Sequence, residues 1–235
     1  MKIRILILLS VSVILITSCA PAKFYIDENF KNVNPGVSLI ITQVNEIDIS
    51  QDYELFTLDN LRKVRNLFFE YQRALLPSSI KNISRFKMVK TASYKIPPQF
   101  ENKVFTVNEK ENVEILVPKT KLNYGEEGAQ YVLFFQNYKI AFELEETDSS
   151  DPARTVSAEK LPGLDPQLKP NKLYRPLFTI RTKYFLYDNE NSKVVIAGNA
   201  VIKERYTPEM NLDNVMVESL NQLAKRIIEK TPFQE

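Results

Sequence analysis

Serine and lysine recur three residues apart at three places in this chain. That spacing can set a nucleophilic hydroxyl beside a basic amine. The pairs are Ser78 and Lys81, Ser84 and Lys87, and Ser157 and Lys160. A Ser/Lys hydrolase of this type also carries S-D-N and K-T-G elements. Both are missing, and Lys90-Thr91-Ala92 is a poor and badly placed substitute. The spacing is therefore interpreted as chance.

Several other chemistries are excluded by residues that the chain lacks. It has no histidine and one cysteine, which excludes Ser-His-Asp and Cys-His nucleophiles and zinc sites built on histidine or cysteine. Its five glycines form neither a Walker nor a dinucleotide-binding pattern. They are Gly36, Gly125, Gly128, Gly163 and Gly198. We therefore expect a protein without catalytic residues, metal or cofactor.

Carboxylates gather between Glu143 and Asp151, and paired carboxylates can hydrolyse glycosides. Oxygen ligands there would also allow weak calcium binding, although no EF-hand spacing is present. The simplest interpretation is an exposed acidic turn.

Aromatic residues are frequent in the expected strands, where most should be core residues or cross-strand pairs. The alternative is a ring-lined site for a sugar or a lipid. The rings concerned are Phe134, Phe135, Tyr138, Phe142, Phe178, Tyr184, Phe185 and Tyr187.

Cys19 is the residue with the clearest chemical role. Lys2 and Arg4 precede a short apolar run, Ile5 to Ile16, as in a secretory signal. The run is too short to span a membrane comfortably, which needs roughly 20 residues. Ile16-Thr17-Ser18-Cys19 resembles the lipobox of bacterial lipoproteins, with Ile in place of the commoner Leu. We expect a signal peptide over 1–18 and a diacylated, palmitate-type anchor on Cys19, followed by a tether over 19–36.

Charge gives no reason to expect a nucleic-acid partner. The chain has 31 basic residues, among them Lys2 and Arg4 of the expected signal, against 29 acidic ones. Hydrophobic residues make up 44% of the chain, which supports a packed globule.

Periodicity predicts a single α+β domain over 37–235. Expected strands are Val37–Val44, in a central position, then Phe86–Thr91 and Tyr131–Leu144. Expected hairpins pair Lys103–Val107 with Val113–Val117, and Leu177–Asp188 with Lys193–Glu204. A helix should run from Thr57 until Pro77 ends or kinks it, and another from Leu212 to Ile228. The fold expected is a mixed sheet of about six to seven strands with two main helices on one face.

The segment 145–171 differs in kind from its neighbours. It carries four prolines and no clear hydrophobic period. Segments of this length without period are usually functional or disordered, so we expect a long mobile insertion.

The stretch Gly128-Ala129-Gln130-Tyr131-Val132-Leu133, the strand–turn–strand unit Phe178–Ile202 and the helix from Leu212 form a familiar order. The order resembles a superfamily of cell-envelope lipoproteins and periplasmic modules. Its members include the curli secretion lipoprotein, the lipoprotein activator of a penicillin-binding protein and the N-terminal module of the Tol-Pal propeller protein. The resemblance implies a small α/β domain that serves assembly or partner binding, and it carries over no functional residue.

The leading hypothesis is a non-catalytic, membrane-anchored binding or assembly module whose partner is another envelope protein. Ala20 after Cys19, rather than Asp, favours the outer membrane, facing the periplasm. The alternatives are a lipid- or glycan-binding lipoprotein and a carboxylate-based envelope hydrolase.

Overall fold

A computed structural model describes residues 24–30, 36–52, 58–93, 98–108, 111–124, 130–148, 155–157, 172–207, 209–229 and 231–235. The expected signal over 1–18 and Cys19 lie outside these ranges, as does most of the 145–171 segment.

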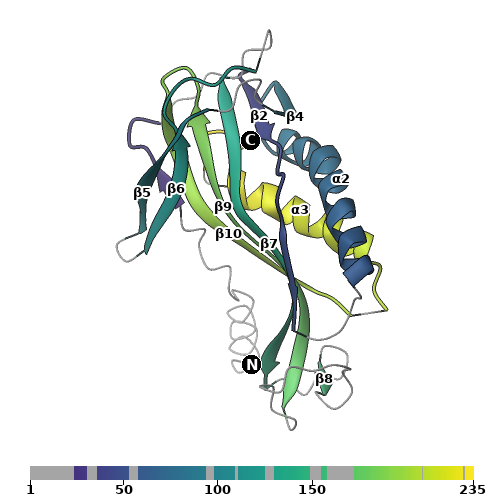
Figure 1. Ribbon diagram of the computed structural model, residues 1–235. Coiled ribbons are helices and arrows are strands. Elements are labelled where there is room, and N and C mark those ends of the chain that lie inside the picture. The colour runs from purple at the N-terminus through teal and green to yellow at the C-terminus, as the bar shows by residue number, and fades with distance from the viewer. Residues whose placement is uncertain are drawn as a thin grey trace, which may run out of the picture.

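The expected α+β class is confirmed: a mixed sheet carries two helices on one face and a small hairpin on the other (Figure 1). The eight-stranded sheet runs in the order β1-β10-β9-β7-β2-β4, with β3 beside β7 and β8 beside β9. Its strands are β1 (Phe24–Ile26), β2 (Ser38–Thr42), β3 (Asp48–Gln51), β4 (Met88–Ala92), β7 (Tyr131–Thr147), β8 (Val156–Ser157), β9 (Leu173–Asp188) and β10 (Lys193–Arg205). The hairpin is β5 (Phe100–Asn108) with β6 (Glu111–Pro118), and the helices are α2 (Leu58–Asn82) and α3 (Leu212–Ile228).

The strand expected at the centre of the sheet does lie there. β2 pairs in parallel with β4 on one side and with β7 on the other. Leu39, Ile40 and Ile41 are almost fully buried, because both faces of this part of the sheet are covered.

The long strand β7 contains a bulge that reverses its side-chain alternation. Its register with β9 shifts between Gln136 and Lys139, and Asn137 has a φ of 52°, a left-handed value that Asn tolerates better than most residues. Before the bulge Leu133 faces the helices, and after it Ile140 and Phe142 do so. The bulge also divides the partners of β7, since β2 pairs before it and β3 after it.

Helix α2 continues past Pro77 to Asn82, so of the two outcomes expected at this proline, an end or a kink, the end is wrong. The buried face extends beyond the proline, because Ile80 is fully buried. Ser78 and Ser79 lie within hydrogen-bond distance of the carbonyls of Ala74 and Leu75, one turn earlier. We infer that continued packing outweighs the roughly 3 kcal/mol that an internal proline costs.

Helix α3 forms as its periodicity predicts. The Asn211 side chain accepts a hydrogen bond from the Asp213 N–H at 2.8 Å and caps the first turn. Leu220, Leu223 and Ala224 are fully buried between α3 and the sheet.

Three short strands, β1, β3 and β8, have no counterpart in the sequence expectation. β1 lies within the expected tether and pairs with Ile196–Gly198 of β10. β7 continues to Thr147 and β8 pairs with β9, so strands enter the segment expected to be a mobile insertion. Strands of two to four residues are too short to show an alternation of apolar and polar residues, so the sequence does not reveal them.

The hairpin β5–β6 covers only one end of the second face of the sheet. Val113, Ile115 and Val117 of β6 pack there against Val132 and Phe134. Two side-chain amides fix its place. The Gln136 amide exchanges hydrogen bonds with the backbone N–H and C=O of Leu116, and the Asn189 amide does the same with Leu122.

An aromatic cluster joins four separate segments beside β2. Phe233 stacks on Phe86 with ring centres 4.3 Å apart and meets Tyr131 edge-on at 5.0 Å. Phe30 completes the cluster, 5.3 Å from Phe233.

Replacing Phe233 should therefore destabilise the fold strongly, since its ring is only 1% exposed. We expect Phe233→Ala to lower the free energy of unfolding by about 3–5 kcal/mol, measured by denaturant titration. Val104→Ala is the control: Val104 is 63% exposed, and its loss should change that free energy by less than about 0.5 kcal/mol. Equal effects of the two variants would contradict this packing.

Candidate functional site

Beyond the bulge, the second face of the sheet is polar, and none of the described helices or strands lies over it (Figure 1). We call this region the open face. Its side chains come from β7, β9 and β10: Lys139, Glu143, Glu145, Arg175, Leu177, Thr179, Arg181, Val201, Lys203 and Arg205. The register brings them together, because Glu143 lies opposite Leu177, which in turn lies opposite Arg205.

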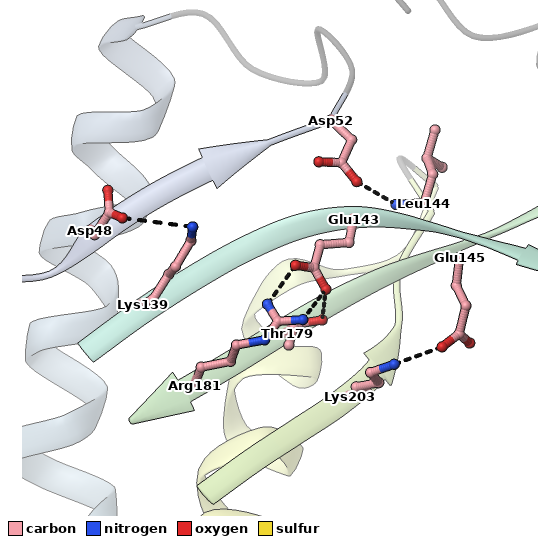
Figure 2. A network of polar contacts seen from close by, with 9 residues as sticks. All are labelled: Asp48, Asp52, Lys139, Glu143, Leu144, Glu145, Thr179, Arg181 and Lys203. Atoms are coloured by element: carbon pink, nitrogen blue, oxygen red, sulfur yellow. Dashed lines mark hydrogen bonds and ion pairs between the residues drawn. The ribbon is translucent and has the colours of Figure 1, made fainter. Parts of the chain in front are cut away.

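Glu143 is the centre of the open face (Figure 2). Both of its carboxylate oxygens accept hydrogen bonds from the Arg181 guanidinium, at 2.5 and 2.7 Å, and Thr179 donates a third at 3.0 Å. Such a two-pronged pair is among the stronger charge-assisted contacts. Partial burial raises the pKa of Glu143, but the hydrogen bonds from Arg181 and Thr179 outweigh it and leave the pKa lowered.

Further ion pairs surround this centre (Figure 2). Glu145 accepts from Lys203 at 2.6 Å, and Lys139 lies 3.9 Å from Asp48 of β3. The Asp52 carboxylate accepts the backbone N–H of Leu144 at 2.9 Å, which ties the end of β3 to β7.

This arrangement does not favour the carboxylate hydrolase. A general acid needs a raised pKa, whereas Glu143 has a lowered one and is fully engaged. Glu145 and Glu146 are paired with Lys203 and Lys172, the latter at 2.9 Å. Across the ranges that the structure describes, no group of three or more acidic or cysteine residues is placed to hold a metal ion.

Among the described residues, no hydrogen bond joins the serine of a Ser–Lys pair to its lysine. The Ser78 hydroxyl lies 3.5 Å from the carbonyl of Ala74, one helical turn earlier. Ser84 is buried in an isolated bridge with Gln234. Lys160 lies outside the described residues.

The aromatic residues of the strands fill the core, as expected for most of them. Phe134 stacks on Phe185 at 4.6 Å, and Phe142 meets Phe178 edge-on at 5.4 Å. Burial raises the pKa of Tyr184, as it does for Tyr138. Most of these rings pack within the core. Phe134, Phe135 and Tyr138 also line a depression of about 380 Å³, and the alternative of a lipid or glycan site rests on these three rings.

A second feature, missed from the sequence, lies along the outer edge of β10. β1 pairs with this edge only at Ile196–Gly198, so Asn199–Arg205 has no strand beside it among the described residues. We call this stretch the β10 edge. Reading it from sequence would have required the strand order of the sheet, which local patterns do not give.

A groove of about 720 Å³ lies between the β10 edge and the helices. Its polar lining comes mainly from α3, and it is closed along α2 by Ser79, Asn82 and Ile83. At its border Gln222 donates to both Glu204 and Glu218. Burial and the nearby charge of Glu218 raise the pKa of Glu204.

Cys19 lies outside the described residues, and the structure neither adds to nor alters its expected role. Among the described helices, none is long and apolar enough to cross a membrane.

Comparison with known proteins assigns no family. No family model matches the sequence, and no curated protein matches it. A solved structure of the PelC dodecamer from Paraburkholderia phytofirmans is similar at 12% identity and a TM-score of 0.32, over 86% of this chain and 92% of that one. A putative neuraminyllactose-binding hemagglutinin homolog from Helicobacter pylori gives 11% identity and a TM-score of 0.40, over 88% and 90%. Likenesses at this level assign no function.

The Glu143–Arg181 pair should make the free energy of unfolding depend on pH in the acidic range. Because the folded-state pKa of Glu143 is lowered, its ionised form stabilises the fold above the unfolded pKa of about 4.3. That contribution is lost as the pH falls through the folded-state value. We expect wild type to lose more free energy of unfolding than Glu143→Gln between neutral pH and about pH 3, measured by denaturant titration.

Asp48→Asn is the matched control. Asp48 also faces a cation, but at 3.9 Å and with a side chain 71% exposed. Its replacement should leave the acid dependence unchanged. If both variants behave alike, the special role of Glu143 is disproved.

Proposed function

We propose that this protein is a lipid-anchored lipoprotein of the cell envelope that binds another envelope protein and catalyses no reaction. The β10 edge, open beside a polar groove, is the observation that carries the binding role. The lipobox-like Ile16–Cys19 supports the anchor. The resemblance to envelope assembly lipoproteins points the same way, and Ala20 favours the outer membrane, facing the periplasm.

The β10 edge can accept a strand from a partner. In an edge strand, backbone N–H and C=O groups of every second residue point away from the neighbouring strand and lack a ladder partner. An extended segment laid against the edge would satisfy those groups, which is the basis of recognition by strand addition. Seven residues from Asn199 to Arg205 are a typical strand length.

Charge along the groove restricts the partner's sequence. Lys203 lies on the edge itself, and a charge in that position limits unspecific pairing between sheets. Lys225 of α3 and Glu229, the C-cap of that helix, lie across the groove. The best partner is therefore an extended segment with polar and charged side chains toward Lys225 and Glu229.

The open face supports the same role by holding the strands in place. The Glu143–Arg181 pair links a side chain of β7 to a side chain of β9 on the open face. Since β9 also pairs with β10 along the whole edge, a docking strand would meet a rigid template.

Lipid attachment should depend on Cys19 alone. Cys19 is the one cysteine of the chain, so Cys19→Ala removes every thiol that could be acylated. We expect the variant to lose incorporation of a fatty-acid label in cells, with the label followed on a gel. A variant labelled as strongly as wild type would contradict the anchor, and the matched control Ser18→Ala should keep its label.

Partner contact should be confined to the β10 edge. A photo-crosslinking residue at position 201, where Val201 is 42% exposed, should give one discrete protein adduct in intact cells. The same residue at position 104 is the control, because Val104 is exposed but lies on β5. Equal adducts from both positions, or none from 201, would contradict strand addition.

A further inference from the structure

The open face contains a depression of about 500 Å³ with an excess of positive charge. It is lined by Glu145, Arg175, Leu177, Lys203 and Arg205. Three cations thus surround one carboxylate and one buried leucine. The depression lies on the face of the sheet opposite the helices. Lys203 and Arg205 belong to the β10 edge, but their side chains point to the open face.

The strand register explains why these residues converge. Arg205 lies directly opposite Leu177, and Arg175 lies directly opposite Glu145, so all four point to the same side of the sheet. Lys203 is two residues before Arg205 and therefore shares that side. Leu177 is only 6% exposed, which leaves the charged groups around an apolar centre.

The three cations of the depression differ in whether they have an ion-pair partner. Glu145 accepts from Lys203 at 2.6 Å and lies 3.8 Å from Arg175. The Arg205 side chain forms no hydrogen bond or ion pair with any part of the chain that the structure describes, and the Glu209 carboxylate lies within its electrostatic range. Glu145 is the one carboxylate in the lining of the depression, and the Arg205 guanidinium can meet an incoming anion.

We propose that this depression binds a phosphate group, either free phosphate or a phosphomonoester. Three cations and one carboxylate in the lining give the depression an excess of positive charge, which suits a group that carries about −1.5 to −2 charges at neutral pH. Guanidinium groups are planar and match phosphate oxygens in pairs of hydrogen bonds. A volume of about 500 Å³ lies within the range of small-molecule sites, so there is room for the organic part of an ester over Leu177.

Glu145 acts as an internal competitor in this site. Its carboxylate lies where it engages two of the three cations, as a ligand oxygen would. An entering phosphate must share Lys203 and Arg175 with it or displace it. Removal of this carboxylate should therefore strengthen phosphate binding, an effect that general damage to the fold would not produce.

The test is calorimetric titration of the detergent-solubilised full chain with inorganic phosphate, glycerol 3-phosphate and acetate at low ionic strength. We expect both phosphates to bind and acetate, a monoanion, to bind at least several-fold more weakly. Arg205→Gln should weaken phosphate binding roughly tenfold, and Glu145→Gln should strengthen it roughly fivefold. Tighter binding of glycerol 3-phosphate would assign an ester, and tighter binding of inorganic phosphate the free ion.

Lys139→Gln is the matched control, because it removes a positive charge from the same face outside the depression. It should change phosphate affinity by less than about twofold. The proposal is overturned if wild type binds no phosphate, if acetate binds as tightly, or if the control weakens binding as much as Arg205→Gln. Should Arg205→Gln fold poorly, a failure of Glu145→Gln to strengthen binding overturns it alone.

Discussion

At Asn137 the backbone of β7 adopts a left-handed conformation, and the bulge there sets the arrangement of everything around it. Ahead of the bulge, the apolar residues of β7 serve two cores, one under the helices and one under the hairpin β5–β6. Past it, the alternation reverses, so that Ile140 and Phe142 continue the helix-side core while Glu143 and Glu145 face outward. Gln136 holds the edge of the hairpin at this point through the backbone of Leu116.

As a result, the two faces of the sheet are stabilised by different interactions. On the helix side, apolar packing provides the stability of the fold. On the open face, paired charges such as Glu143 with Arg181 hold the strands together without a cover. Side chains on the open face and the β10 edge can therefore vary with little effect on the packing of the helix-side core.

Much of this architecture follows from local sequence. The periodicity of α3 and the two hairpins predicted those elements, because each depends on contacts between neighbours in the chain. β1 and β3 are too short to show a period. Local sequence does not decide between an end and a kink at Pro77, because continued packing beyond the proline keeps the helix going. The open face could not be predicted, since Glu143 and Arg181 meet only through the register of β7 with β9, and that register includes the bulge. The β10 edge likewise depends on strand order, which no local pattern encodes.

The parallel pairing of β2 affects how the chain assembles. β9, β10 and α3 follow one another directly, and their contacts close short loops at small entropic cost. β2, by contrast, must find β7 across about ninety residues, and α2 separates it from β4 in the chain. Long-range parallel contacts of this kind form slowly. We therefore expect folding to begin in the antiparallel C-terminal half, with β2 entering last as the strand that locks the aromatic cluster beside it.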